Sequence, residues 1–247
     1  MEAHNPTGVA IGQEVPKPVS AVIFDMDGLL LDTEGAYTVA QQRILDRFCR
    51  TFTWELKALM MGRQPQEGAR VLLEALQLTP EEITPEQFLA ERDALLRDVF
   101  PDSPLMPGAE RLVRHLAAHR VPIALATGSS QSQFALKTSK HGELFGLFNR
   151  VITGDMVHRA KPDPAIFLAA AEGFPLPQPT PGSVLVFEDA PNGVEAALAA
   201  GMRVVMVPYP GMPEEISRGC GATAVFASLE DFKPEQWGLP PYTDSST

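Results

Sequence analysis

Two pairs of acidic residues each follow a short apolar run that predicts a buried strand. Asp25 and Asp27 follow the first such run, and Glu188 and Asp189 follow a later one. In extended chain, residues i and i+2 point to one side, and the carboxyl ends of parallel strands line the ligand crevice of open α/β sheets. Two carboxylates placed there can act as nucleophile and as general acid/base. Since four converging acids repel one another, we expect a hard divalent cation, Mg²⁺, among them.

Three further residues have the properties of phosphate ligands. Thr127 and Gly128 follow another apolar run and precede a helical pattern, where a hydroxyl group and unpaired backbone N–H groups favour a phosphate. Lys161 stands directly before Pro162 and can neutralise an anion. Each motif by itself also fits an ordinary helix cap or a capped loop. Together, and in this order along the chain, the motifs indicate phosphoryl transfer, which depends mainly on positioning and charge neutralisation.

The elements that would position these residues alternate between strand and helix. Short apolar strands are expected at Ala21–Phe24, Val121–Ala126, Val151–Ile152, Val184–Phe187 and Val204–Val207. Segments with helical spacing, several of them rich in alanine, lie between the later strands. This alternation predicts the α/β class: a Rossmann-like parallel sheet covered by helices on both faces.

The segment after the first strand has a different character. Residues 34–103 contain no strand-like run, their apolar residues recur at helical spacing, and prolines divide them into about four helices. We therefore expect a helical cap at 34–103, inserted into a core formed by 19–33 and 104–240. Residues 1–18 are expected to be a flexible N-terminus and 241–247 a C-terminal tail.

Composition excludes several classes of protein. The chain of 247 residues has 20 Lys and Arg against 31 Asp and Glu, a net charge of −11, which disfavours nucleic acid and anionic membranes as partners. Its two cysteines, Cys49 and Cys220, cannot form a disulfide framework or a cysteine-based zinc motif. We find no signal peptide and no membrane-spanning run. The expectation is a cytoplasmic monomer that acts on a small molecule.

Four segments resemble the sequence motifs of the haloacid dehalogenase superfamily. They are Phe24–Thr33, Thr127, Lys161–Pro164 and Val186–Ala197. Their order, with a helical segment between the first and second, resembles the subgroup that has a small helical cap. Within it, the chain from about Val19 to Tyr242 is most similar to enzymes that dephosphorylate pseudouridine 5′-phosphate. One departure is Ala160, which stands where the family has glycine.

The resemblance implies a Mg²⁺-dependent phosphomonoesterase that works through a phosphoaspartate and takes a small phosphorylated metabolite, pseudouridine 5′-phosphate first. Asp25 is implied as the nucleophile, and Asp27 as the acid and then the base. The implied phosphate ligands are Thr127, Gly128 and Lys161. The implied metal ligands are Asp25, the backbone carbonyl of Asp27, Asp189 and, directly or through water, Glu188.

Three alternatives remain open at this stage. A phosphatase for glycerol phosphate or another sugar phosphate would carry the same motifs. A mutase of the β-phosphoglucomutase kind also resembles the chain, but those mutases have a histidine where this chain has Tyr37. A non-catalytic protein that binds a phosphorylated metabolite would be expected to lack one of the acidic residues or Lys161, and all of them are present.

Overall fold

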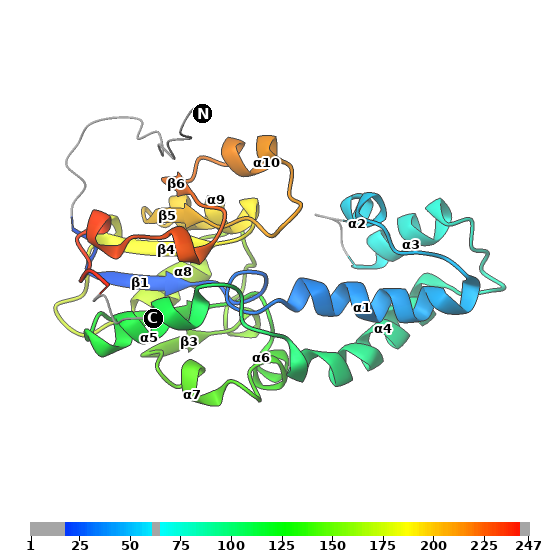
Figure 1. Ribbon diagram of the computed structural model, residues 1–247, viewed down its shortest axis with the longest axis horizontal. Helices are drawn as coiled ribbons and strands as arrows, with labels where there is room; N and C mark the ends of the chain where they lie inside the picture. The colour runs from blue at the N-terminus through cyan, green and yellow to red at the C-terminus, as the bar shows by residue number, and fades with distance from the viewer. Residues whose placement is uncertain (1–17, 61–64, 243–247) are drawn as a thin grey trace, which may run out of the picture. The chain divides into compact units, whose positions relative to one another are not determined.

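A computed structural model describes residues 18–60 and 65–242 (Figure 1). These residues form two compact units. An α/β unit holds the described residues up to Leu31, Leu105–Phe134 and the chain from His141 onward. A helical unit holds Asp32–Pro104 together with Ala135–Lys140, a segment that the sequence analysis expected within the core.

The predicted fold class is confirmed by a six-stranded, all-parallel sheet with the strand order β3-β2-β1-β4-β5-β6 (Figure 1). The strands are β1 Ala21–Phe24, β2 Ile123–Ala126, β3 Arg150–Ile152, β4 Val184–Glu188, β5 Arg203–Met206 and β6 Ala224–Val225. The helical unit is inserted after β1. Five strands agree with the sequence prediction within two residues at each end, and β6 was not predicted.

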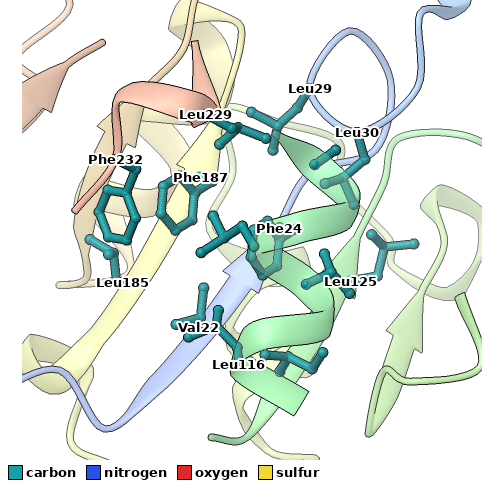
Figure 2. Close-up of a cluster of buried hydrophobic side chains, with 14 of the residues drawn as sticks. Val22, Phe24, Leu29, Leu30, Leu116, Leu125, Leu185, Phe187, Leu229 and Phe232 are labelled. Carbon is teal, nitrogen blue, oxygen red and sulfur yellow. The ribbon is translucent and has the colours of Figure 1, made fainter. Parts of the chain in front are cut away.

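Side chains of β1 alternate between two apolar layers, as the period of a strand requires. Val22 and Phe24 pack on the face that carries α5, Ala109–Ala118, and Phe24 stacks on Phe187 with ring centroids 5.1 Å apart (Figure 2). Ala21 and Ile23 pack on the opposite face. The helices of that face are α8, Ala165–Ala171, and α9, Pro191–Ala199. The central strand is therefore buried on both sides.

Shorter helices complete the α/β unit. They are α7 Gly142–Phe145 and α10 Glu214–Gly219, while α6, Gln131–Lys137, begins in the α/β unit and ends in the helical unit. Among the described residues, no helix has the length and apolar character that a bilayer span requires.

In the segment between β1 and β2, the described part of the helical unit contains four α-helices, the number expected from the sequence. They are α1 Thr33–Leu45, α2 Trp54–Met60, α3 Pro65–Ala75 and α4 Pro85–Val99. Two side chains define where helices begin: Asp32 accepts a hydrogen bond from the Gly35 N–H at 2.8 Å, and Thr84 forms a capping box with Gln87 before α4. The buried core of this unit includes Ile44, Leu72 and Phe88 among others.

The strand order determines where a ligand would bind. The chain proceeds from β1 to β2 and β3 on one side, then crosses to β4, β5 and β6 on the other. In sheets of this order, ligands occupy the crevice beyond the carboxyl ends of the two strands where the direction of winding reverses. Here those strands are β1 and β4, which end at Phe24 and Glu188.

Candidate active site

The turn that follows β1 depends on a glycine. Asp25 continues the strand, since its N–H donates to the Phe187 carbonyl at 3.0 Å. Gly28 then adopts a φ of +78°, and a Cβ at this position would lie 2.3 Å from Oδ2 of Asp189. A residue with a side chain would therefore be strained in its backbone and would displace that carboxylate. Gly28 brings the acidic residues after β1 and β4 close together.

Lys161 connects the residues at the ends of three strands. Its ammonium group donates to Oδ1 of Asp25 at 2.5 Å, to Oε1 of Glu188 at 2.6 Å and to the Ala126 carbonyl at 3.1 Å. An ammonium group has three hydrogens to donate, so each of them has a partner. The Lys161 side chain is only 10% exposed. Despite Ala160, the loop before Lys161 delivers the lysine to the predicted site.

Both carboxylate oxygens of Glu188 are held by the chain itself. Oε2 accepts hydrogen bonds from the backbone N–H groups of Asp189 and Ala190 at 3.0 and 3.1 Å, and Oε1 accepts from Lys161. A Cβ on Gly193 would lie 1.9 Å from Oε1, so only glycine leaves room for this carboxylate. The arrangement makes Glu188 a fixed partner of Lys161, while its expected role toward a metal stays a prediction.

A cation would fit the acidic residues at this edge of the sheet. Oxygen atoms of Asp25, Glu188 and Asp189 lie within 4.8 Å of one another. Lys161 contacts two of these three carboxylates, those of Asp25 and Glu188, and all-oxygen donors suit Mg²⁺. The donor set therefore fits the predicted metal, and the contribution expected from the Asp27 backbone carbonyl stays a prediction.

Burial and charge alter the ionisation of the two central groups. The pKa of Asp25 is raised to about 7, chiefly by burial and to a smaller extent by Glu188 and Asp27, against the lowering effect of the Lys161 ammonium group. Burial disfavours the charged form of Lys161, but the carboxylates of Asp25 and Glu188 outweigh it, and the pKa of Lys161 is raised above its usual value. The lysine therefore stays charged and can offset a developing negative charge.

Asp27 has different partners from Asp25. Its Oδ2 accepts hydrogen bonds from the hydroxyl groups of Thr127 at 3.0 Å and of Ser129 at 2.8 Å. Thr127 is fully buried, whereas Gly128 is exposed at the same turn. Thr127 and Gly128 were predicted as site residues, whereas Ser129 had no predicted role. The available indication was a second hydroxyl two residues after a strand-end threonine.

The turn after β2 is fixed by the loop that follows β3. Gly154 donates its N–H to the Ser129 carbonyl at 2.8 Å, and Asp155 accepts from the Gln131 N–H at 3.1 Å. A Cβ on Gly154 would lie 2.3 Å from the Gly128 carbonyl oxygen. This contact between backbones was not predicted, because nothing in the sequence joins two loops that are distant along the chain.

Comparison with known proteins finds relatives over nearly the whole chain. The model of the family described as haloacid dehalogenase-like hydrolase matches residues 19–201. (DL)-glycerol-3-phosphatase 2 of Arabidopsis thaliana is 49% identical over 244 residues, which covers 98% of this chain and 99% of the relative. A Drosophila melanogaster protein named "Probable pseudouridine-5'-phosphatase" is 47% identical over 237 residues, covering 95% of this chain and 100% of the relative.

Solved structures show the same fold. The crystal structure of a HAD family hydrolase from Deinococcus radiodurans with bound phosphate and sodium superimposes with a TM-score of 0.76 at 25% identity, covering 91% of this chain and 99% of that one. The family match extends over most of the sequence, and the relatives above are nearly full-length matches named as phosphatases. The chain therefore belongs to the haloacid dehalogenase-like hydrolases, and it is a phosphoric monoester hydrolase.

Proposed function

We propose that the protein hydrolyses small phosphate monoesters in a Mg²⁺-dependent reaction that passes through a phosphoaspartate on Asp25. The observation that carries this proposal is the convergence of Asp25, Lys161, Glu188 and Asp189 at the β1–β4 switch point. A buried carboxylate bonded to an ammonium group and surrounded by metal-type ligands suits attack on an anionic ester.

The residues divide the chemistry between them. A carboxylate oxygen of Asp25 attacks phosphorus, and Lys161 neutralises charge on the phosphoryl oxygens. Thr127 and the backbone at Gly128 bind the phosphate. Asp27 protonates the leaving oxygen and then deprotonates the water that attacks the phosphoaspartate. Support for the separate roles of the two aspartates comes from their different partners, an ammonium group for one and hydroxyl groups for the other.

Asp25 and Asp189 would hold the Mg²⁺ ion, with the Asp27 backbone carbonyl and, directly or through water, Glu188. When bound, the ion supplies positive charge that lets a phosphate dianion approach three carboxylates. Lys161 alone cannot supply enough positive charge for that approach, since its hydrogens are shared between Asp25, Glu188 and a backbone carbonyl.

For the substrate we propose pseudouridine 5′-phosphate, with glycerol 3-phosphate as the second candidate. The Drosophila relative supports the first, and the Arabidopsis relative, of similar identity, supports the second. Both are small phosphate esters of an alcohol, so both require protonation of an alkoxide leaving group.

A panel of phosphate esters tests the proposal, with released phosphate as the readout in the presence of Mg²⁺ and after chelation. We expect the largest kcat/KM for pseudouridine 5′-phosphate and no turnover without metal. Full activity after thorough chelation would contradict the metal assignment. A clear preference for glycerol 3-phosphate would support the proposed reaction and contradict the proposed substrate. Light scattering and imaging of tagged protein test the expectation of a cytoplasmic monomer.

A further inference from the structure

The side chain of Asp27 is held by two hydroxyl groups that bond to the same oxygen atom. Thr127 and Ser129 both donate to Oδ2, at 3.0 and 2.8 Å. A protonated carboxyl group has one hydroxyl oxygen and one carbonyl oxygen. The carbonyl oxygen is the better acceptor of the two, so two donors at Oδ2 favour placing the transferable proton on Oδ1.

Thr127 cannot maintain this arrangement throughout a reaction. A threonine hydroxyl has one hydrogen, and in the structure that hydrogen is directed to Asp27. The Thr127 oxygen also accepts from the Ser129 N–H at 3.0 Å. If Thr127 donates to a bound phosphate, as the proposed function requires, its hydrogen bond to Asp27 is broken. The Ser129 hydroxyl would then be the donor that still holds Oδ2.

Ser129 is well placed for such a role. The residue is 7% exposed. Its N–H donates to the Thr127 hydroxyl oxygen, and its carbonyl accepts from the Gly154 N–H at 2.8 Å. The hydrogen bond donated by its backbone N–H and the one accepted by its carbonyl thus fix the position from which its side chain donates to Asp27.

We infer that Ser129 is a positioning residue for the general acid/base, an inference that rests on the proposed function. Ser129 keeps Oδ2 of Asp27 as a hydrogen-bond acceptor and so directs the Oδ1 proton to the leaving group. As the Asp25–phosphorus bond forms and the ester P–O bond breaks, that proton passes to the leaving alkoxide and Asp27 becomes a carboxylate. Asp27 then accepts a proton from water as the water oxygen attacks phosphorus and the bond to Asp25 breaks.

The leaving group distinguishes this role from a contact with the phosphate. Ser129→Ala is compared with the original protein on glycerol 3-phosphate, whose alkoxide must be protonated, and on 4-nitrophenyl phosphate, whose leaving group needs little protonation. Because kcat/KM reports the steps up to phosphorylation of Asp25, we expect about a tenfold loss on the alkyl ester and less than about a twofold loss on the aryl ester. The control Ser132→Ala removes an exposed hydroxyl from the same segment and should leave both values unchanged.

A second substitution tests whether Ser129 acts through Asp27. In an Asp27→Asn background there is no proton to direct, so adding Ser129→Ala should cause no further loss of phosphoenzyme formation from the alkyl ester. Equal losses on the two esters, or a loss that persists in this background, would overturn the inference. Turnover by the original protein, and its loss on chelation, test the proposed function separately, because neither depends on Ser129.

Discussion

At the scale of single residues, the two aspartates that follow β1 are distinguished by their hydrogen-bond partners. Asp25 accepts a hydrogen bond from the ammonium group of Lys161, and Asp27 accepts hydrogen bonds from the hydroxyl groups of Thr127 and Ser129. A charged partner stabilises a carboxylate beside an incoming phosphate. Neutral hydroxyl donors accommodate both the carboxylate and the protonated carboxyl, as an acid/base requires.

Substitution of each aspartate should therefore have a distinct result with an aryl phosphate. Asp25→Asn removes the nucleophile and should abolish both turnover and the phosphoenzyme. Asp27→Asn should slow phosphorylation less than hydrolysis of the intermediate, because an aryl leaving group needs little protonation. Acid-quenched labelling should show covalent phosphate on the Asp27→Asn protein and none on the Asp25→Asn protein. Equal labelling of the two variants would contradict these roles.

Mg²⁺ binding should depend on pH through Asp25. The metal requires an ionised carboxylate, and burial raises the pKa of Asp25 to about 7 in the metal-free protein. Below this pH the neutral acid dominates, so the apparent affinity should be about tenfold lower at pH 6 than at pH 8. Titration calorimetry in buffers of different ionisation enthalpy should detect proton release near pH 7. Asp25→Asn is the control, and heats that do not depend on the buffer at pH 6.5 would contradict the prediction.

Sequence reasoning identified the residues that meet at the carboxyl edge, but not all of their contacts. Asp25, Thr127 and Lys161 were predicted because each falls in a motif of recognisable composition. The contact of Ser129 with Asp27 was missed, because only the folded turn after β2 directs that hydroxyl group toward a residue 102 positions earlier in the chain. The hydrogen bonds that the Glu188 carboxylate accepts from the backbone were missed as well. They depend on N–H groups whose directions are set only by the folded turn.

At the scale of elements, the turn after β2 depends on the close approach of two backbones. Gly154→Ala would place a Cβ 2.3 Å from the Gly128 carbonyl oxygen, where backbone atoms would have to move. We expect a loss of about 1–3 kcal/mol of stability and a fall of at least about tenfold in kcat/KM, because the turn carries Thr127 and Ser129. Urea unfolding and phosphate release provide the measurements.

Gly182→Ala is the matched control, because its Cβ would meet no atom within 4 Å. It should leave both stability and activity nearly unchanged. If Gly154→Ala behaved like this control, the contact between the two loops would have no functional importance.

The elements themselves were largely predictable. Continuous apolar runs predicted the central strands β1, β2 and β4 because strands buried on both faces carry few polar residues, and shorter apolar runs predicted β3 and β5. β6 was missed because Ala224–Val225 has only two residues, and the short apolar run Ala224–Ala227 that contains them was not interpreted as a strand. The grouping of Ala135–Lys140 with the helical unit was also missed. It depends on packing within that unit, where the buried ammonium group of Lys137 lies 4.4 Å from the centroid of the Phe100 ring.

At the scale of the whole molecule, the last described segment is joined to the first. The Val19 N–H donates to the Trp237 carbonyl at 2.9 Å. The centroid of the Trp237 ring lies 5.9 Å from the centroid of the Phe232 ring and 4.5 Å from Cζ of Arg203. The C-terminal segment thus covers the apolar layer beside β1 and belongs to the core of the α/β unit.

Removal of this side chain should destabilise the α/β unit. For Trp237→Ala we expect a loss of about 3 kcal/mol in the free energy of unfolding, since a large buried aromatic group is replaced by a cavity. Urea denaturation measures the change. Leu176→Ala is the control, because Leu176 is 85% exposed and its truncation should cost less than about 0.5 kcal/mol. A Trp237→Ala protein as stable as this control would show that the segment is dispensable.

The central place of β1 has a consequence for synthesis of the chain. β1 is made first, yet one of its two neighbours in the sheet is β4, whose residues begin at Val184. Pairings across so long a separation form slowly, because a large loop must close first. Until then, one apolar strand edge stays open to other chains. A nascent chain should therefore need chaperone protection until β4 has been translated, and a fragment that ends before β4 should aggregate.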